Sequence, residues 1–396
     1  MKIVIAPNAF KESLGAPQAA RAMARGWKRV FPQAETVESP VADGGDGTAQ
    51  AFAAASGGRL VWHRVQGPLG QPVRAHFAWN SAGATAVVEM AQASGLWLAP
   101  PRRRNPMKTT TVGAGQLAAA ALRLGAKRIV IGLGGSATVE GGAGFAAALG
   151  FHLLDKRGRP IGPGGEGLER LSRIIPPDRP LWGEDTEFIA ATDVSNPLLG
   201  PNGAAAVFGP QKGATPDQTK RLEAALANLA ELIERDFGRR VAQIPGAGAA
   251  GGLGAGLAGL FGAKLCSGIE TFLDLIGFDE KLRGADLALT GEGRLDRQTA
   301  FGKAPMGVAR RAARQGVPVI ALAGSLGPGH ESLLRRGFAA VLGIVPGPIA
   351  LEEALRNAPR FLAGQTEAIA RLYALGQGRE MVNRLRGEDS ARPSRR

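Results

Sequence analysis

Two aspartates and three glycines share one short segment of this chain. Asp43 and Asp46 stand three residues apart within Ala42–Thr48, which reads Ala-Asp-Gly-Gly-Asp-Gly-Thr. Glycine allows the backbone to approach a ligand closely, and carboxylates can hold Mg²⁺ or accept a proton from a hydroxyl group. A turn in which Asp46 or Thr48 caps the following helix is the alternative. Because a cap requires neither both acids nor all three glycines, we favour a functional segment.

A second glycine-rich segment, Gly132–Gly144, follows a short apolar run and leads into an expected helix. Backbone N–H groups in such a loop, and the positive end of the helix dipole, attract phosphate. Gly134, Gly135 and Ser136 are therefore candidates for binding a nucleotide. The segment matches neither the Walker pattern nor a dinucleotide fingerprint. A plain tight turn with close helix–strand packing is the alternative.

Two single side chains also follow expected strands. Lys11 comes soon after the first apolar run and could meet a phosphate or a carboxylate, although a solvated lysine is the alternative. Asp193 follows the run Phe188–Ala191 after Thr192 and is a candidate for binding a metal or a substrate hydroxyl group. The residues after it, Asn196-Pro197 and Gly200–Gly203, are also ordinary turn formers.

The segment Thr290–Asp296 combines a cation with two acids, Glu292 and Asp296, after another apolar run. Arg294 could pair with a carboxylate substrate or with a phosphate. An internal ion pair between Arg294 and Asp296 that orders the loop is a serious alternative. Acids gathered in loops after strands, without a GxSxG pattern and with four scattered histidines, fit phosphoryl transfer better than acyl transfer.

The elements that must position these residues alternate along the chain. Apolar runs that end in Gly, Asn, Asp or Pro indicate buried parallel strands. They span 2–6, 128–131, 188–191, 286–290, 317–323 and 341–345. Amphipathic stretches between them indicate helices over 16–30, 112–124, 214–235 and 303–315, and a further short helix is expected over 48–55. This alternation predicts an α/β fold with helices on both faces of a largely parallel sheet.

The region 60–90 differs, because its runs 60–65, 73–79 and 85–90 resemble antiparallel strands around the turn Gly67–Gly70. We therefore expect a Rossmann-like domain, 1–60 plus 280–378, and an inserted domain with a mixed sheet, 61–279. Residues 379–396 are expected to be a basic disordered tail. The Gly- and Ala-rich stretch 246–259 is either a hinge or interdomain crossing or a close-packed helix start.

Composition excludes several classes of protein. The net charge of +14 comes from dispersed basic residues, mostly Arg, without a basic helix interleaved with aromatics, so we expect no nucleic acid partner. The single cysteine, Cys266, excludes an intramolecular disulfide and a cysteine-based zinc cluster. No signal peptide or membrane-length apolar run is evident, so we expect a cytoplasmic protein without a membrane partner. A homodimer is left open.

With these segments assembled, the chain resembles the bacterial glycerate kinase type-1 family along nearly its whole length. The resemblance rests on long motifs in the right order. They are 6–11, 42–48, 134–138, 196–204, 251–254, 290–296 and 302–305. The chain departs from the family pattern at Asp46, where Glu is usual, at Val139-Glu140, where Asn-Asp is usual, and at Thr192 and Ser195, where Cys and Asp are usual.

The resemblance implies phosphorylation of D-glycerate by ATP, with 2-phosphoglycerate the usual product, ADP released and an active site in a cleft between two α/β domains. Our own hypothesis for the roles is as follows. ATP with Mg²⁺ lies against Gly134, Gly135 and Ser136, with Glu292 also on the nucleotide side. Asp43 and Asp193, with Asp46, bind the metal or accept the hydroxyl proton, and Lys11 and Arg294 hold the carboxylate or the transferring phosphate.

Three alternatives remain open at this point. A related small hydroxy acid could be the substrate. A nicotinamide-dependent oxidoreductase could use the same glycine-rich loops, although the acidic residue expected after the next strand is not evident. A regulator of the same fold that binds sugar acids would need none of the paired acids.

Overall fold

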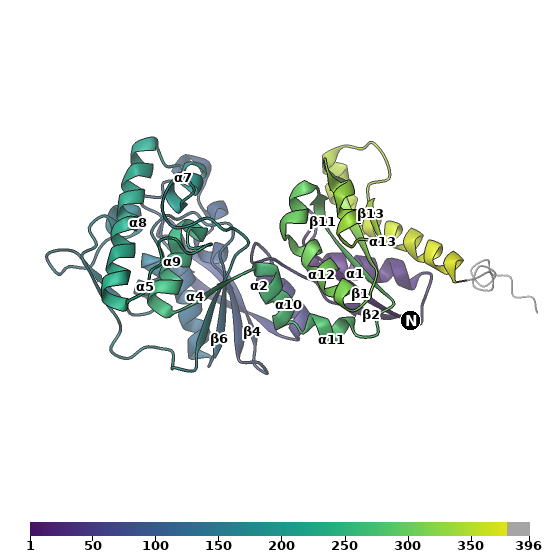
Figure 1. The fold of residues 1–396 in the computed structure, drawn as a ribbon, viewed down its shortest axis with the longest axis horizontal. Helices are drawn as coiled ribbons and strands as arrows, with labels where there is room; N and C mark the ends of the chain where they lie inside the picture. The colour runs from purple at the N-terminus through teal and green to yellow at the C-terminus, as the bar shows by residue number, and fades with distance from the viewer. Residues whose placement is uncertain (378–396) are drawn as a thin grey trace, which may run out of the picture. The chain divides into compact units, whose positions relative to one another are not determined.

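The computed structural model describes residues 1–377, and the predicted basic tail lies outside the described residues. The chain divides into two compact units (Figure 1). Unit 1 consists of Met1–Val41 together with the chain from Gly277 onward, and unit 2 is Ala42–Ile276. The sequence-based domain ranges stay a prediction, because a compact unit of contacts is not by itself an independently folding domain.

Unit 1 is built on a parallel sheet with the strand order β13-β12-β11-β1-β2 within the described residues. All the paired neighbours run parallel. The strands are β1 (Lys2–Pro7), β2 (Glu35–Glu38), β11 (Leu287–Leu295), β12 (Val319–Leu326) and β13 (Ala340–Gly343). The central strands are buried, as their unbroken apolar runs predict.

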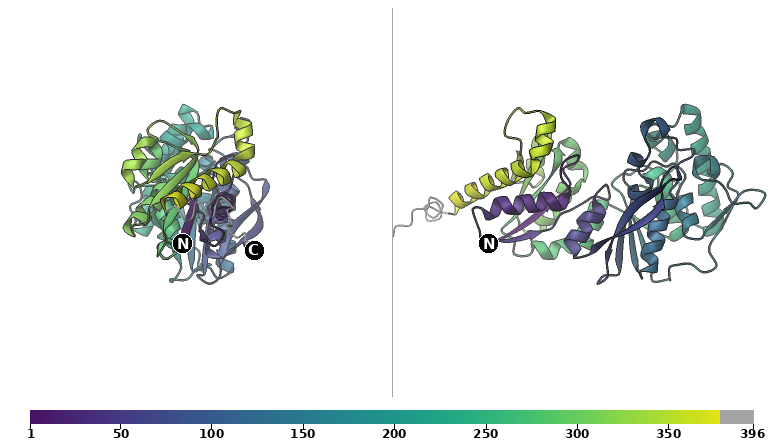
Figure 2. Two further views of the ribbon diagram at one scale, coloured as in Figure 1. Left: turned by 90° about the vertical axis from the view of Figure 1, so that its right-hand side faces the viewer. Right: turned by 180° about the vertical axis from the view of Figure 1, so that it is seen from behind.

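Long helices cover this sheet. Helices α1 (Ala16–Lys28) and α13 (Leu351–Gly376) pack against each other, and Figure 2 shows them side by side. Ile3, Ile5 and Leu322 of the sheet join their apolar faces in one core. Helix α12 (Ala304–Arg314) packs on β1, β11 and β12, and α11 (Phe278–Leu282) packs on α12. Short 3₁₀ segments, η4 (Arg297–Phe301) and η5 (His330–Arg336), follow β11 and β12.

Unit 2 is built on a mixed sheet with the order β10-β9-β6-β5-β4-β3. Its strands are β3 (Arg59–Gln66), β4 (Pro72–Asn80), β5 (Thr85–Glu89), β6 (Arg128–Gly132), β9 (Glu187–Ala191) and β10 (Lys264–Cys266). The hairpin β3–β4 and the pair β4–β5 are antiparallel, whereas β5, β6, β9 and β10 are parallel neighbours. A small separate sheet joins β7 (His152–Leu154) to β8 (Arg173–Ile175).

The helices of unit 2 form its layers. They are α2 (Thr48–Ser56), α3 (Ala91–Ser94), α4 (Val112–Arg123), α5 (Ala143–Ala148), α6 (Gly164–Leu168), α7 (Ala204–Phe208), α8 (Pro216–Phe237), α9 (Ala249–Phe261) and α10 (Gly268–Leu275), with 3₁₀ segments η1 (Leu96–Leu98), η2 (Pro101–Arg103) and η3 (Pro210–Lys212). Small residues on α4, Gly113 and Gly115, let it pack closely on β3 and α5, and α4 shares one core with β5 and β6. Helices α8 and α9 share a second core with the β7–β8 sheet.

The predicted α/β fold, with one largely parallel and one mixed sheet, is confirmed. The stretch 246–259 is a close-packed helix start rather than a hinge. Helix α9 contains left-handed backbone at Ala250, Gly251 and Gly252, and a Cβ on Gly251 would overlap the carbonyl oxygen of Thr138. Strand β11 runs to Leu295, so the predicted loop 290–295 is part of a strand.

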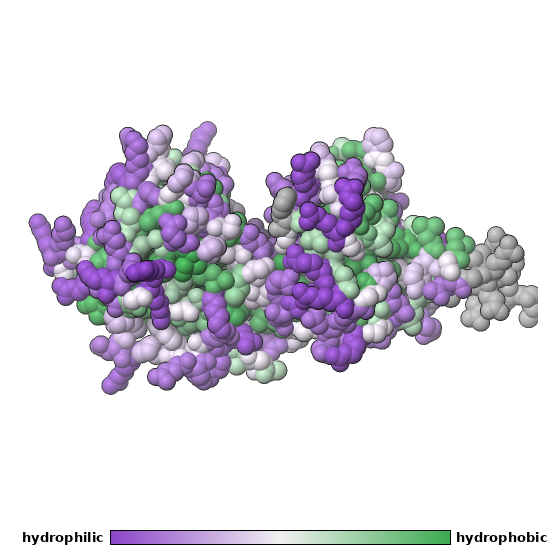
Figure 3. Space-filling model, in the orientation of Figure 1, coloured by the Kyte–Doolittle hydropathy of each residue, from purple (hydrophilic) through white to green (hydrophobic). Residues whose placement is uncertain are grey.

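Hydrophilic side chains predominate on the face of each unit that Figure 3 shows, as expected for helices whose apolar faces pack inward. In residues 1–377, no helix is both long and apolar enough to cross a membrane.

Candidate active site

The structure divides the predicted site residues into two sets. Unit 2 carries Asp43, Asp46, Asp193 and the loop Gly134–Ser136, and unit 1 carries Lys11, Glu292 and Arg294. In each unit the residues gather at the carboxyl edge of the parallel strands, where ligands bind in open α/β sheets. The predicted cleft between two domains stays a prediction.

The edge in unit 2 forms because four parallel strands end there side by side. Glu89 ends β5, the glycine-rich loop follows β6, Asp193 follows β9 and Ser267 follows β10. Residues that are far apart in sequence therefore become neighbours. We call this group of side chains and loops the acid edge.

The segment Asp43–Asp46 lies directly on the acid edge, and glycine makes this approach possible. The Gly134 N–H donates to the Gly44 carbonyl oxygen at 3.3 Å. A Cβ on Gly132 would stand 2.6 Å from that oxygen, and one on Gly268 would overlap the carbonyl oxygen of Asp43. Any larger side chain at Gly132 or Gly268 would push the acid-bearing segment away.

Asp193 and Asp43 form a coupled pair of carboxylates. Burial of the Asp193 carboxylate and the negative charge of Asp43 raise the Asp193 pKa to about 6. Asp193 is an exposed residue as a whole, but its Oδ1 faces the protein. That oxygen accepts hydrogen bonds from Ser267 Oγ at 3.1 Å and from the Gly268 N–H at 2.9 Å. A carboxylate with this pKa is ionised at neutral pH and still basic enough to take up a proton.

Glu89 is a member of the acid edge that the sequence did not reveal. It is 1% exposed, and it accepts hydrogen bonds from the backbone N–H groups of Ala49 at 2.6 Å and Gly47 at 3.1 Å. It thus caps α2, and neither Asp46 nor Thr48 serves as the cap suggested as an alternative. Burial, with a smaller effect of Asp46, raises the Glu89 pKa to about 7.

The glycine-rich loop differs from a simple phosphate cradle at a helix end. Helix α5 begins only at Ala143, and the carboxylate of Glu140 already fills its N-terminus, where Gly144 N–H donates to Oε1 at 3.1 Å. Glu140 also accepts from Thr111, Thr110 and Gly164, so it is a fully bonded structural carboxylate. The positive end of α5 therefore gives no support to nucleotide binding, and the proposed role of the loop rests on Gly134, Gly135 and Ser136 themselves.

A buried lysine lies behind that loop. Lys212 Nζ donates to Ser136 Oγ at 2.6 Å and to the Thr138 carbonyl oxygen at 2.8 Å. Burial lowers the Lys212 pKa to about 7. No local signal in the sequence marks this residue, because Pro210–Lys212 resembles an ordinary turn before a helix.

The set in unit 1 gathers where β1 and β11 run side by side. A Cβ on Gly293 would stand 3.2 Å from the backbone nitrogen of Lys11, so the end of β11 touches the loop that follows β1. Lys11 is exposed. Glu292 is buried and accepts from Thr299 Oγ1 at 2.9 Å.

Arg294 lies in the same set. It pairs with Asp296 at 3.3 Å between Nε and Oδ2, while 62% of its side chain stays exposed. The internal ion pair named above as the alternative is thus present, and the exposed guanidinium can still meet an anion.

The carboxylates of the acid edge fit a hard divalent cation. No group of three or more His, Cys, Asp or Glu side chains in residues 1–377 is arranged to hold a metal ion by itself. Mg²⁺ in phosphoryl-transfer sites needs only one or two carboxylates, because water and substrate phosphates supply its other ligands. Asp43 and Asp193 meet that requirement, and Asp46 lies beside Gly135 at the same edge.

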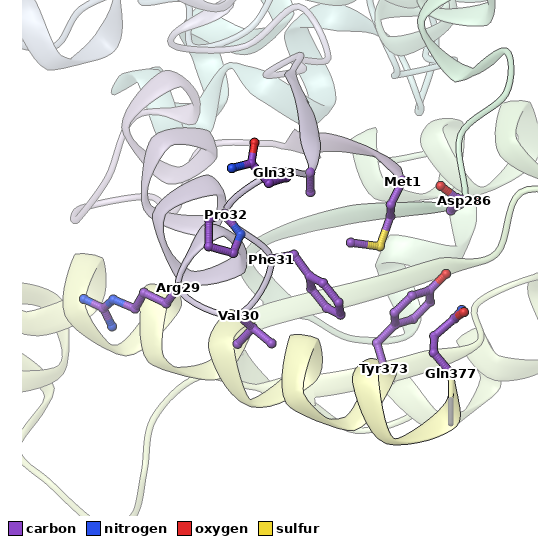
Figure 4. A pocket seen from close by; sticks show the side chains of 10 residues that line it. Met1, Arg29, Val30, Phe31, Pro32, Gln33, Asp286, Tyr373 and Gln377 are labelled. Atoms are coloured by element: carbon purple, nitrogen blue, oxygen red, sulfur yellow. The ribbon is translucent and has the colours of Figure 1, made fainter. Parts of the chain in front are cut away.

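A cavity of about 780 Å³ lies elsewhere in unit 1 (Figure 4). Phe31 and Tyr373 line it together with Met1 and Asp286, the residues that immediately precede β1 and β11. It therefore lies at the amino edge of the sheet, opposite Lys11, Glu292 and Arg294, and contains none of the predicted site residues.

The family model described as "Glycerate kinase family" matches residues 3–374. The chain belongs to the glycerate kinase family. The predicted resemblance and the prediction of a kinase are thereby confirmed.

Individual relatives agree with the family match. A protein of Halalkalibacterium halodurans named glycerate kinase is 48% identical over 93% of this chain and 97% of its own length. A protein of Escherichia coli K12 named glycerate 2-kinase is 44% identical over 95% of this chain and 99% of its own. A crystal structure of a protein assigned as glycerate kinase 2 from Salmonella typhimurium LT2 has a TM-score of 0.86 at 44% identity, covering 95% and 99% of the two chains.

Proposed function

We propose that this protein transfers the γ-phosphoryl group of ATP to a hydroxyl group of D-glycerate, releasing ADP and a phosphoglycerate. The observation that carries the proposal is the family match over residues 3–374, which coincides with a coupled pair of carboxylates at a strand edge. The 2-hydroxyl is the favoured acceptor, because the Escherichia coli relative is named glycerate 2-kinase.

In the proposed reaction, the substrate hydroxyl oxygen attacks the γ-phosphorus and the bond from that phosphorus to the bridging oxygen of ADP breaks. The hydroxyl proton moves to a carboxylate of the acid edge. Asp193 suits this role, because its pKa of about 6 keeps it ionised at neutral pH while leaving it a better base than an ordinary aspartate. Ser267 and Gly268 donate to Oδ1 and thereby fix the orientation of the Asp193 carboxylate.

Mg²⁺, when bound with ATP, would neutralise charge on the phosphates during transfer. Asp43 is the first candidate to hold it, with Asp193 and Asp46 as further ligands. Gly134, Gly135 and Ser136 would contact the nucleotide phosphates. Lys11 and Arg294 are cationic groups for the glycerate carboxylate or the transferring phosphate, and Glu292 would act on the nucleotide side.

The test is a coupled assay of ADP release from ATP with Mg²⁺, run with and without D-glycerate. We expect release that depends on D-glycerate, and phosphorus NMR of the product should show a phosphate on the 2-position. Release without D-glycerate, or release with another small hydroxy acid at a kcat/KM tenfold or more above that for glycerate, would overturn the proposed substrate. Asp185→Asn, an exposed carboxylate in unit 2, serves as a control variant with unchanged kcat/KM.

A further inference from the structure

Lys212 is a buried lysine without a charged partner. It ends η3 and is 2% exposed. Its two hydrogen bonds, to Ser136 Oγ and to the Thr138 carbonyl oxygen, both go to neutral acceptors. Within the described part of the chain, no aspartate or glutamate forms an ion pair with its Nζ. Burying an ammonium against neutral groups alone is unfavourable, so this position calls for a reason beyond packing.

The charged groups on neighbouring segments do not explain why a lysine is buried at this position. Arg104 packs its backbone against Gly213, next to Lys212. Glu140 lies two residues beyond Thr138, but its bonds go to Thr110, Thr111, Gly144 and Gly164. Asp46 lies beside Gly135, where a Cβ would stand 3.3 Å from its Oδ1, and it forms no ion pair with Lys212 within the described residues. Burial is the one cause of the lowered Lys212 pKa, so no neighbouring charge offsets the ammonium.

The contact with Ser136 determines what that hydroxyl can do. Ser136 Oγ accepts a hydrogen bond from Lys212 at 2.6 Å, and no residue of the described chain accepts a hydrogen bond from it. Its own proton is therefore available to an additional acceptor. Ser136 follows Gly135, an exposed residue of the acid edge. An anion bound on the loop would accept from the Ser136 hydroxyl group and lie close to the Lys212 charge.

We propose that Lys212 is a positioning residue for phosphoryl transfer, which orients the Ser136 hydroxyl toward a nucleotide phosphate and places a positive charge behind the glycine-rich loop. This inference rests on the proposed function for its ligand, the phosphate chain of ATP. Lys212 then needs no carboxylate partner in the protein, because the negative charge of the bound phosphate balances its positive charge.

Steady-state kinetics of Lys212→Met, Ser136→Ala and the double variant test the proposal, with exposed Lys220→Met as the matched control. We expect each single variant to raise KM for ATP at least tenfold and to change KM for glycerate less than threefold. Because Lys212 acts through Ser136, the double variant should fall within about threefold of the worse single variant. An unchanged KM for ATP in Lys212→Met, or multiplied losses in the double variant, would overturn the inference.

Calorimetry of ADP binding gives a readout that needs no turnover. Burial lowers the Lys212 pKa to about 7, so a bound phosphate, which stabilises the ammonium, should raise the protonation of Lys212 near neutral pH. Titrations at pH 7 in buffers of different ionisation enthalpy should therefore show more proton uptake by the wild type than by Lys212→Met. Equal proton uptake would contradict the inference even if the protein phosphorylates glycerate. Suppose instead that the wild type takes up more protons than Lys212→Met but releases no ADP in response to glycerate. Lys212 would then still be an anion-binding residue, and only the proposed substrate would be wrong.

Discussion

Burial of the Asp193 carboxylate and, second to it, the negative charge of Asp43 hold the pKa of Asp193 above its ordinary value. The two residues come from segments 150 positions apart in sequence, and glycines at the ends of the strands allow those segments to meet. A pair of like charges in one place is unfavourable for folding and is typical of a site that binds a cation or moves a proton.

Replacing Asp193 with Asn removes the proposed base with little change in shape. We expect kcat to fall at least a hundredfold, while the melting temperature at pH 7.5 stays equal or rises slightly. The gain in stability should be at most about 1 kcal/mol, because solvent screens the charge of this exposed residue. The pKa of Asp193 is higher in the folded protein than in the unfolded chain, so its charge destabilises the fold only above about pH 4. Any gain in the stability of Asp193→Asn should therefore grow as the pH rises from about 4 to about 6 and be absent below about pH 4.

Kinetics and thermal melts of Asp193→Asn against Asp185→Asn check this expectation. Asp185 is an exposed carboxylate of the same unit that pairs with Lys127. Turnover of Asp193→Asn within threefold of the wild type would remove Asp193 from the chemistry.

Removal of the Asp43 charge should be visible at Asp193. In Asp43→Asn, the Asp193 pKa should move downward from about 6, since the like charge that raises it has gone. In the wild type we expect kcat/KM to fall as the pH drops through about 6, as Asp193 takes up a proton. Carbon NMR titration of the aspartate carboxylates, assigned with Asp193→Asn, measures the shift directly. An Asp193 pKa that is the same with and without Asp43 would show that the two carboxylates are not coupled.

Gly268 tests whether the close approach of the acid-bearing segment matters. Alanine there would overlap the carbonyl oxygen of Asp43, so Gly268→Ala should displace the segment and reduce kcat/KM at least tenfold. The matched control is Gly364→Ala on α13, where a Cβ meets nothing within 4 Å. Because position 364 is exposed, that change should stabilise the protein by about 0.5–1 kcal/mol without affecting activity. Equal activity of both variants would mean that the segment tolerates movement.

Glu89 should be important for stability as well as for the position of Asp46. Glu89→Ala leaves the N–H groups of Gly47 and Ala49 without their acceptor, which should lower the free energy of unfolding by about 2–3 kcal/mol. Glu89→Gln keeps an amide oxygen that can accept, so its loss should be smaller. Urea denaturation measures both changes, and Gln92→Ala is the control because Gln92 makes only the weaker 3.3 Å contact to Glu89. A loss in Glu89→Ala no larger than in Gln92→Ala would rule out the capping role.

The sequence predicts the parts of this fold that carry local signals. The buried runs at 2–6, 128–131 and 188–191 became β1, β6 and β9 with ends shifted by at most one residue. Since parallel strands place their carboxyl ends together, the residues after them could be named as site candidates before the fold was known. Helix α13 was not among the helices expected from the sequence.

Side chains that act from a distance in sequence could not be predicted in this way. Glu89 ends a strand and reads as an ordinary strand residue until β5 places it under α2, 40 residues away in sequence. Lys212 reads as a solvated turn residue, and only the fold of unit 2 buries it against Ser136. Arg294 differs from these two residues, because its ion pair with Asp296 was named from the sequence and is present in the structure. Its role toward an anionic ligand stays a prediction.

The buried Lys212 also predicts how stability depends on pH. Its pKa is about 7 in the folded protein and near 10.5 in an unfolded chain, so between these values the unfolded state binds more protons. The free energy of unfolding should therefore rise with pH across this window, by at most about 1.4 kcal/mol per pH unit from this residue. Lys212→Met lacks the titrating group and should be more stable than the wild type at pH 7, with the difference shrinking toward pH 10. Guanidinium denaturation of the two proteins at pH 7, 8.5 and 10 measures the gap, and Lys220→Met should follow the wild type throughout. Parallel curves for Lys212→Met and the wild type would mean that Lys212 stays charged in the folded protein, paired with a group other than Ser136 and Thr138.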